Sequence, residues 1–304
     1  MNKPIIEKIK KLKKERNAVI LVHNYQLPEV QDIADYIGDS LGLSIQASKT
    51  EADVIIFCGV YFMAETAKIL SPDKIVLIPD KTAGCPMADM ITKEKLVELK
   101  KTNPDAKVVA YVNTTAEVKT ECDICCTSSN AELVVKNFTK DIEKLIFIPD
   151  KYLGSYIANK LGKEFILYDG YCPSHVKIME EDIKREKEKH PEAKILVHPE
   201  CISEVIKLAD AVLSTDGMVK YAKNSNAKEF IIGTEIGIIH RLQKENPDKK
   251  FYPASNLAIC PNMKKITLEK VYWSLEEMKY EVILNKETIE KARNPIEKMI
   301  SLVK

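Results

Sequence analysis

Three stretches of this 304-residue chain repeat one residue pattern at nearly equal intervals. Each stretch opens with Glu-Val. A small residue stands four positions after the Val, and an Asp follows it directly. A hydroxyl residue stands five positions after that Asp and ends the stretch. The copies begin at Glu29, Glu117 and Glu204, which are 88 and 87 residues apart. A fixed period of this kind indicates homologous structural units. We therefore predict three modules, although length alone suggests about two domains.

Short apolar runs alternate with segments of helical spacing in every copy. Nine runs have the composition of buried strands: 19–22, 54–57, 75–78, 108–112, 145–148, 165–167, 195–197, 230–232 and 250–252. Alternating strands and helices predict parallel β/α units. We expect an α/β protein of three homologous three-layer α/β/α domains with short parallel sheets. The predicted modules are 1–103 with an N-terminal helix, 104–190, and 191–304 with a C-terminal helical extension.

The repeat separates the eight cysteines into two groups. Every module ends in a Cys-Pro pair, at Cys85, Cys172 and Cys260, and these three are spaced like the repeat. Equivalent residues of three modules can meet only if the modules surround a pseudo-threefold axis. Three thiolates at one point favour a metal, and a [4Fe–4S] cluster held by three cysteines leaves one iron open. Three buried structural thiols are the alternative, because free cysteine is often buried.

The remaining cysteines do not follow the repeat. Cys122, Cys125 and Cys126 form a C-x2-C-C pattern that resembles half of a zinc site, but a second half at zinc-finger spacing is missing from the sequence. Cys122 takes the place of an Ala in the other copies, so we predict a helical, core-packing position for it. Cys58 and Cys201 are likewise expected to be core thiols or neighbours of the crevice.

Polar residues follow the first strand of every module. The strands end at His23, Tyr111 and His198, and two positions later stand Tyr25, Asn113 and Glu200. Residues just past the carboxyl ends of parallel strands line the ligand crevice of α/β sheets. We predict ligand-binding or proton-transfer roles for the histidines, and acid–base roles for Tyr25, Tyr111 and Glu200. A buried hydrogen-bonded network is the alternative for the last three.

Other candidates flank these positions. His175 follows Cys172 by three residues and has no His counterpart in the other modules, which favours a functional role. Ser40, Ser128 and Thr215 have the character of N-caps of a second helix, where they would either bind substrate anions or merely cap the helix. None of the four arginines holds a crevice position. We therefore expect Ser, Thr, His, Lys and backbone N–H groups to hold anions.

Charge and hydropathy exclude several classes of partner. There are 46 Lys and Arg against 45 Asp and Glu, a formal net charge of +1, which argues against nucleic acid or an anionic membrane as a bulk partner. The longest apolar runs are far shorter than the ~20 residues that cross a bilayer. The first residues lack the apolar stretch of a secretion signal. We expect a cytoplasmic protein.

Taken together, the motifs resemble those of the quinolinate synthase family over about residues 15–270. They are His-Asn-Tyr at 23–25, Gly-Asp-Ser-Leu at 38–41, Tyr-Val-Asn-Thr-Thr at 111–115, the stretch 123–130, His-Pro-Glu-Cys at 198–201, Ser-Thr-Asp-Gly-Met at 214–218 and Cys-Pro-Asn-Met at 260–263. The resemblance implies three α/β domains around a central [4Fe–4S] cluster. It also implies condensation of iminoaspartate with dihydroxyacetone phosphate to quinolinate, phosphate and water, on the route to NAD.

The resemblance also implies roles for single residues. The cluster ligands would be Cys85, Cys172 and Cys260. Substrate contacts would come from His23, Ser40, Tyr111, Asn113, Ser128, His198, Glu200 and Thr215. Protons would be managed by Tyr25, Tyr111, His175 and Glu200. Because iminoaspartate is unstable, we further expect a transient contact with the enzyme that produces it.

Two other functions use the same three cysteines. One is a hydro-lyase that applies an open iron to a different hydroxy acid. The other is an iron–sulfur sensor or electron carrier. A carrier usually closes its cluster with four cysteines, and it does not need Tyr, Glu and His around the cluster.

Overall fold

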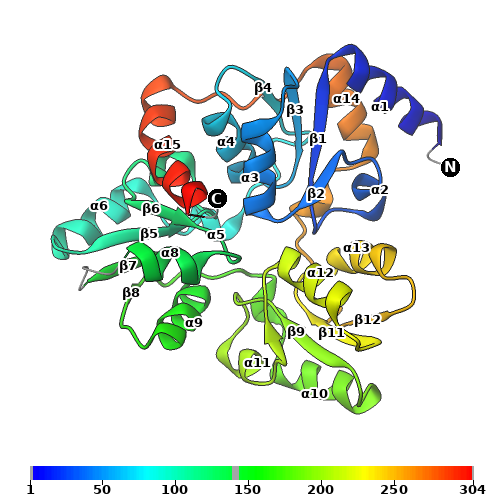
Figure 1. Ribbon diagram of the computed structural model, residues 1–304. Coiled ribbons are helices and arrows are strands. Elements are labelled where there is room, and N and C mark those ends of the chain that lie inside the picture. The colour runs from blue at the N-terminus through cyan, green and yellow to red at the C-terminus, as the bar shows by residue number, and fades with distance from the viewer. Residues whose placement is uncertain (1–2, 139–143, 303–304) are drawn as a thin grey trace.

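The structure is a computed structural model that describes residues 3–138 and 144–302. Its strands form three parallel four-stranded sheets with the orders β2-β1-β3-β4, β6-β5-β7-β8 and β10-β9-β11-β12. Each sheet belongs to one module, and the three modules follow one another from blue through green to yellow in Figure 1. The predicted α/β class with three domains of short parallel sheets is therefore confirmed.

The three modules share one order of elements. The first contains α1 (Lys3–Glu15), β1 (Ala18–His23), α2 (Pro28–Gln31), β2 (Tyr36–Gly38), α3 (Ser40–Lys49), β3 (Val54–Cys58), α4 (Tyr61–Leu70), β4 (Ile75–Leu77), α5 (Pro86–Asp89) and α6 (Lys93–Thr102). The second contains β5 (Lys107–Tyr111), α7 (Ala116–Lys119), β6 (Ile124–Cys126), α8 (Ala131–Phe138), β7 (Leu145–Ile148), α9 (Lys151–Leu161), β8 (Ile166–Leu167), a 3₁₀ helix (His175–Lys177) and α10 (Glu180–Lys189). The third contains β9 (Lys194–Val197), α11 (Ser203–Lys207), β10 (Ala211–Val212), α12 (Thr215–Asn224), β11 (Glu229–Gly233), α13 (Ile238–Glu245), β12 (Lys250–Pro253), a 3₁₀ helix (Met263–Lys265), α14 (Leu268–Glu277) and α15 (Lys286–Ser301).

The central strands are apolar over most of their length because helices cover both faces of each sheet. All five residues of β3 and all four of β7 are buried. In each sheet the first strand of the module pairs with the third, so these two strands lie in the middle. Their carboxyl ends therefore lie side by side, at the crevice position of an α/β sheet.

The described residues contain twelve strands rather than the nine predicted. The three additional strands have only two or three residues each and lie at one edge of each sheet: β2, β6 and β10. The apolar residues of 29–37 have the spacing of a single helix, but α2 ends at Gln31 and the chain then extends into β2. Strands this short carry too few residues to show a period of two.

The repeated Asp explains why these edge strands recur in every module. Its carboxylate Oδ2 accepts a hydrogen bond of 2.8 Å from a backbone N–H of the neighbouring first strand. The three pairs are Asp35 with Ile20, Asp123 with Val108, and Asp210 with Ile195. The repeat motif is therefore partly structural, because the Asp fastens each edge strand to the centre of its sheet.

The structure corrects the position of Cys122. The residue lies in the turn after α7 rather than in a helix, and its Sγ donates to the carbonyl of Val118 at 3.2 Å. It is partly buried against the main core, so its packing role holds. All eight cysteines are free thiols.

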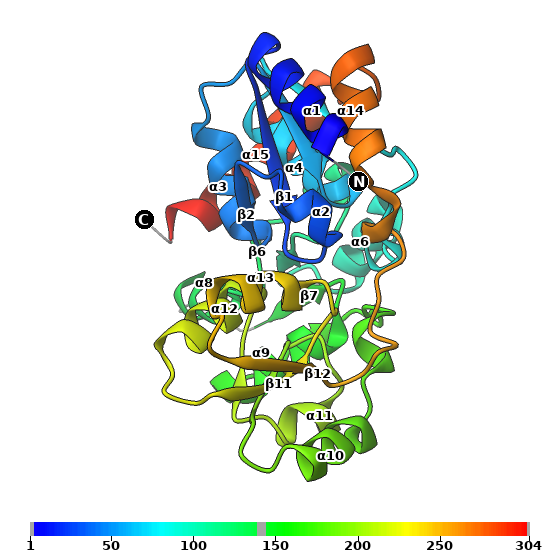
Figure 2. The same ribbon diagram turned by 90° about the vertical axis from the view of Figure 1, so that its right-hand side faces the viewer.

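The C-terminal helices pack away from the third module. Helix α14 lies on α1 and β3, and α15 lies on α4, α7 and β6, as Figures 1 and 2 show. The predicted helical extension of 191–304 thus closes over the first two modules. The module bounds themselves stay a prediction, and their outermost residues, 1–2 and 303–304, lie outside the described residues.

None of the helices in the described ranges is long and apolar enough to cross a membrane.

Candidate active site

A cavity lies where the three modules meet, and residues from all three line it. Every site residue predicted from the sequence borders this cavity: His23, Tyr25, Ser40, Cys85, Tyr111, Asn113, Ser128, Cys172, His175, His198, Glu200, Thr215 and Cys260. The strand-end residues reach it because β1 ends at His23, β5 ends at Tyr111 and β9 ends one residue before His198. Equivalent positions of the repeat therefore meet at one place, and the roles of these residues remain predictions.

The three Cys-Pro cysteines have similar local surroundings. Each is followed by Pro, which has no N–H, and then by a short helix: α5 begins at the Pro itself, and the two 3₁₀ helices begin two residues after it. The backbone N–H groups two and three positions later interact with the sulfur: those of Met87 and Ala88, of Ser174 and His175, and of Asn262 and Met263. Paired N–H groups of this kind favour a thiolate.

This donor set fits an iron–sulfur cluster. Burial raises the pKa of the Cys85 thiol to about 12 and also raises the pKa values of Cys172 and Cys260. Such thiols stay protonated in an empty cavity, whereas a metal replaces the proton and coordinates the thiolate. Three unpaired thiols, each with two N–H donors, are what a cluster with three cysteine ligands requires. Cys85, Cys172 and Cys260 are the residues that could hold it.

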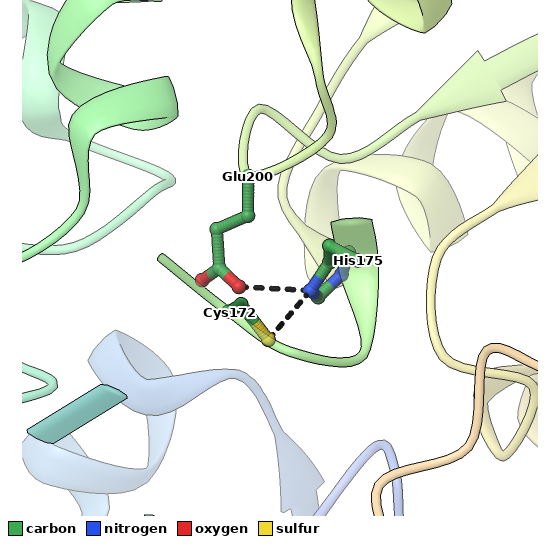
Figure 3. Close-up of side chains that lie close together, drawn as sticks. All are labelled: Cys172, His175 and Glu200. Carbon is green, nitrogen blue, oxygen red and sulfur yellow. Dashed lines mark hydrogen bonds and ion pairs between the residues drawn. The ribbon is translucent and has the colours of Figure 1, made fainter. Parts of the chain in front are cut away.

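Cys172, His175 and Glu200 form a close group in the cavity, with one sulfur, nitrogen or oxygen atom of each within 4.8 Å of the others (Figure 3). Nδ1 of His175 lies 2.8 Å from Oε2 of Glu200 and 3.1 Å from Sγ of Cys172. His175 and Glu200 are both buried. An ionised carboxylate can only accept, so the proton on the imidazole sits on Nδ1 and points to Glu200.

A continuous chain of hydrogen bonds extends from this pair to Tyr25. Nε2 of His175 lies 2.7 Å from Oγ1 of Thr234, and the Tyr25 hydroxyl lies 2.5 Å from the same oxygen. With the His175 proton on Nδ1, Thr234 donates to Nε2 and Tyr25 donates to Thr234. On the other side, the Tyr111 hydroxyl donates to Oε1 of Glu200 at 2.5 Å. The chain can move a proton between Tyr25 and Glu200.

The electrostatics set which groups carry protons. Burial works to raise the pKa of the Glu200 carboxyl, but the imidazoles of His175 and His198 and the hydrogen bonds from His175 and Tyr111 outweigh it, so the pKa lies below its usual range. Burial and the charge of Glu200 raise the pKa values of Tyr25 and Tyr111 well above the usual value. The carboxylate is therefore ionised and able to accept a proton, and the phenols are protonated and able to donate one.

His23 and His198 are neutral donors to the cavity. Burial lowers the pKa of His23 to about 4 and that of His198 to about 3. In each ring Nδ1 accepts a backbone N–H two residues later, from Tyr25 at 3.2 Å and from Glu200 at 3.3 Å. The proton is then on Nε2, and His198 Nε2 donates to Ser128 Oγ at 3.1 Å.

Hydroxyl residues line the cavity at the starts of two helices. The structure corrects the predicted caps by one residue, because Asp39 and Ser214 are the N-caps of α3 and α12. Ser40 and Thr215 are instead the first helical residues, and Ser128 lies in the turn before α8. Helix N-termini favour anions through their free N–H groups and the helix dipole.

Asn113 adds an acceptor to the same wall. Its Oδ1 is buried and has no hydrogen-bond partner among the residues that the structure describes. Because an unpaired buried amide oxygen costs free energy, a bound ligand is the natural donor for it.

Sequence reasoning missed three residues that organise the site, all located after the third strand of a module. Thr234 joins Tyr25 to His175, and Glu235 Oε1 accepts the N–H of Cys260 at 3.1 Å. In the second module, Asp150 holds the equivalent position two residues after the third strand, and its Oδ1 accepts the N–H groups of Tyr152 and Leu153 at the start of α9. The strand-end rule that identified His23 and His198 also applies to the neighbouring central strand, and that signal could have found these residues.

Comparisons with known proteins agree with this arrangement. A family model described as "Quinolinate synthetase A protein" matches residues 7–301. The chain is 54% identical to a quinolinate synthase of Dehalococcoides mccartyi strain CBDB1 over 299 residues, which is 98% of both chains. It is 52% identical to one of Methanosarcina barkeri, covering 98% of this chain and 97% of the relative. It is also 52% identical to one of Caldicellulosiruptor saccharolyticus, covering 98% and 99%. The chain belongs to the quinolinate synthetase A family of enzymes.

Proposed function

We propose that this protein is a quinolinate synthase that condenses iminoaspartate with dihydroxyacetone phosphate, giving quinolinate, phosphate and water, as a step of NAD biosynthesis. The observation that carries the proposal is the meeting of Cys85, Cys172 and Cys260 in one buried cavity beside the Glu200–His175 pair. High identity to enzymes named quinolinate synthase supports it. The cytoplasm stays the predicted compartment.

Cys85, Cys172 and Cys260 would hold a [4Fe–4S] cluster. When bound, the cluster would offer one iron without a protein ligand as a Lewis acid for a substrate oxygen or nitrogen. The three cysteines come from three modules, so binding of the cluster would also join the modules. The same joining explains why one module of about 87 residues cannot build the site alone.

The chain's own residues would move the protons of the condensation. Carbon–carbon bond formation next to a carbonyl or imine requires a base, and loss of a hydroxyl requires an acid. The Glu200 carboxylate suits the base, and the neutral Tyr25 phenol suits the acid. Thr234 and His175 lie between them and would return a proton from the base to the acid.

Neutral donors would bind the anionic substrates. Both substrates carry carboxylate or phosphate groups, and these fit the Nε2–H groups of His23 and His198 and the hydroxyls of Ser40, Ser128 and Thr215. The unpaired Oδ1 of Asn113 would accept from a substrate N–H or O–H.

The test is an anaerobic assay with both substrates. Protein purified without oxygen should contain about four iron and four sulfide per chain and should form quinolinate. Cys85→Ala, Cys172→Ala and Cys260→Ala should each abolish the cluster, while Cys122→Ala, which changes a thiol off the repeat, should keep it. Absence of quinolinate from cluster-replete protein would refute the function. Retention of the cluster in a Cys85, Cys172 or Cys260 variant would refute the ligand assignment.

A second variant separates proton transfer from cluster binding. Glu200→Gln preserves shape but removes the base, so it should keep the cluster and lose turnover. Activity near the wild-type level would remove Glu200 from the mechanism.

A further inference from the structure

Arg241 connects the third module to the first beside the cavity. It lies on α13 and its side chain is largely buried. Its Nη1 donates to Oδ1 of Asn24 and to Oδ1 of Asp216, both at 2.7 Å. Asn24 follows the last residue of β1, and Asp216 is in the first turn of α12. One guanidinium thus spans the boundary between two modules.

The contact with Arg241 fixes the orientation of the Asn24 amide. Arginine can only donate, so the atom of Asn24 that faces it is the carbonyl oxygen. The Asn24 amino group then points the other way and donates to Oγ1 of Thr215 at 2.8 Å and to Asp216 at 3.1 Å. Asn24 is fully buried, so the amide has no freedom to turn without leaving polar atoms unpaired.

This orientation decides what Thr215 can do. Its oxygen already accepts a hydrogen bond from Asn24, so its own O–H is left to donate. Thr215 lines the cavity at the start of α12, where an anion is favoured. A Thr that is held as a donor matches the oxyanion of a carboxylate or phosphate.

Arg241 also neutralises charge at this boundary. Asp216 of the third module stands close to Asp39 of the first, and burial together with the Asp216 charge raises the pKa of Asp39 to about 6. Without the guanidinium, the Asp216 carboxylate would repel an anion that approaches Thr215. Arg241 thus favours anion binding in two ways: it orients the donor at Thr215, and it neutralises the charge of Asp216.

We propose that Arg241 is a positioning residue for substrate binding, which holds Asn24 and Asp216 so that Thr215 donates to an oxyanion of the substrate. The inference rests on the proposed function, because it takes its ligand from that reaction. The oxyanion is the phosphate of dihydroxyacetone phosphate or a carboxylate of iminoaspartate. Separate titration of the two substrates distinguishes them.

The test compares Arg241→Gln with a matched control on the same helix. Lys244→Gln breaks another ion pair between α13 and the first module, Lys244 Nζ to Asp32 Oδ1 at 2.6 Å, without touching Asn24 or Asp216. Arg241→Gln should raise the KM for one substrate about 10- to 100-fold, the effect of losing a charge-assisted hydrogen bond network, and should change kcat and iron content little. Lys244→Gln should leave both kinetic constants unchanged.

Binding can also be measured without turnover. Calorimetry gives the dissociation constants of dihydroxyacetone phosphate and of inorganic phosphate for the cluster-loaded protein. If phosphate is the oxyanion, Arg241→Gln should raise the dissociation constants of both ligands by the same factor as the KM for dihydroxyacetone phosphate. If a carboxylate is the oxyanion, only the KM for iminoaspartate should rise. Arg241→Lys keeps a cation and should recover most of the loss, which also covers the case that Arg241→Gln folds poorly.

The outcomes separate the two proposals. Wild-type protein that binds neither substrate and makes no quinolinate overturns the proposed function and this inference with it. An active wild type whose Arg241→Gln variant keeps both KM values, or loses only thermal stability to the same extent as Lys244→Gln, overturns the inference alone.

Discussion

Removal of the Tyr111 hydroxyl tests the electrostatic design of the site. The phenol donates to Oε1 of Glu200 at 2.5 Å, and both side chains are buried. Tyr111→Phe keeps the ring that fills the space and removes one donor from a buried carboxylate. Hydrogen bonds to charged groups contribute about 1.5–3 kcal/mol. His175 remains as the second donor, so the carboxylate stays in place.

The expected magnitude follows from that loss. A change of about 1.5–3 kcal/mol corresponds to about 10- to 150-fold in rate and to about one to two units in the pKa of Glu200. The pKa of Glu200 is held below its usual range in the wild type, and loss of a donor raises it. The pKa starts far below the working pH range, so Glu200 remains ionised after the change, and the loss should appear in kcat/KM at every pH.

The assay is anaerobic quinolinate formation at a series of pH values, with iron measured for each sample. Tyr111→Phe should lower kcat/KM by about the same factor at every pH and leave iron per chain unchanged. Tyr168→Phe is the matched control, because its hydroxyl donates to the neutral carbonyl of Met90. A Tyr111→Phe enzyme with wild-type kcat/KM would refute the view that the Tyr111 hydrogen bond stabilises the Glu200 carboxylate.

Three further predictions concern stability. Burial lowers the pKa of His23 from 6.5 to about 4, so between these pH values the unfolded chain binds a proton that the folded chain does not. The free energy of unfolding should therefore fall by about 2 kcal/mol from pH 7 to pH 5. Urea unfolding of His23→Gln should show a smaller fall. Lys119 is fully buried and donates to two backbone carbonyls, so Lys119→Met should cost about 2–5 kcal/mol in the free energy of unfolding, and a cost below 1 kcal/mol would contradict the bonding described. A Cβ on Gly170 would lie 2.3 Å from the carbonyl oxygen of Pro149, so Gly170→Ala should lower the midpoint of thermal unfolding and weaken iron retention at nearby Cys172. Gly162→Ala is the control, because its Cβ would meet no described atom within 4 Å although φ is 61°. This variant should lower stability without changing iron content.

The three-module plan and the residues that line the cavity could be predicted from patterns along the chain. The 87- and 88-residue intervals predicted three modules, and the strand-end rule placed His23, Tyr111 and His198 at one crevice. Both inferences depend on local order along the chain, namely the period of the repeat and the apolar run of each strand. Such patterns can be recognised without knowledge of tertiary contacts, because equivalent residues of a repeat occupy equivalent places in the modules.

Tertiary structure alone decided how the polar residues are connected. Thr234 joins Tyr25 across 209 residues of sequence, and Arg241 reaches Asn24 across 217. Thr234 follows a central strand, and that position predicts a crevice residue but not its partner, whereas Arg241 carries no such signal. The partner of each depends on which side chain of another module lies opposite. The positions of the C-terminal helices were decided in the same way, since α15 packs on the first two modules although it follows the third in sequence. A repeat shows which residues are equivalent, but hydrogen bonds between modules join residues that are not equivalent, and only the folded arrangement brings those together.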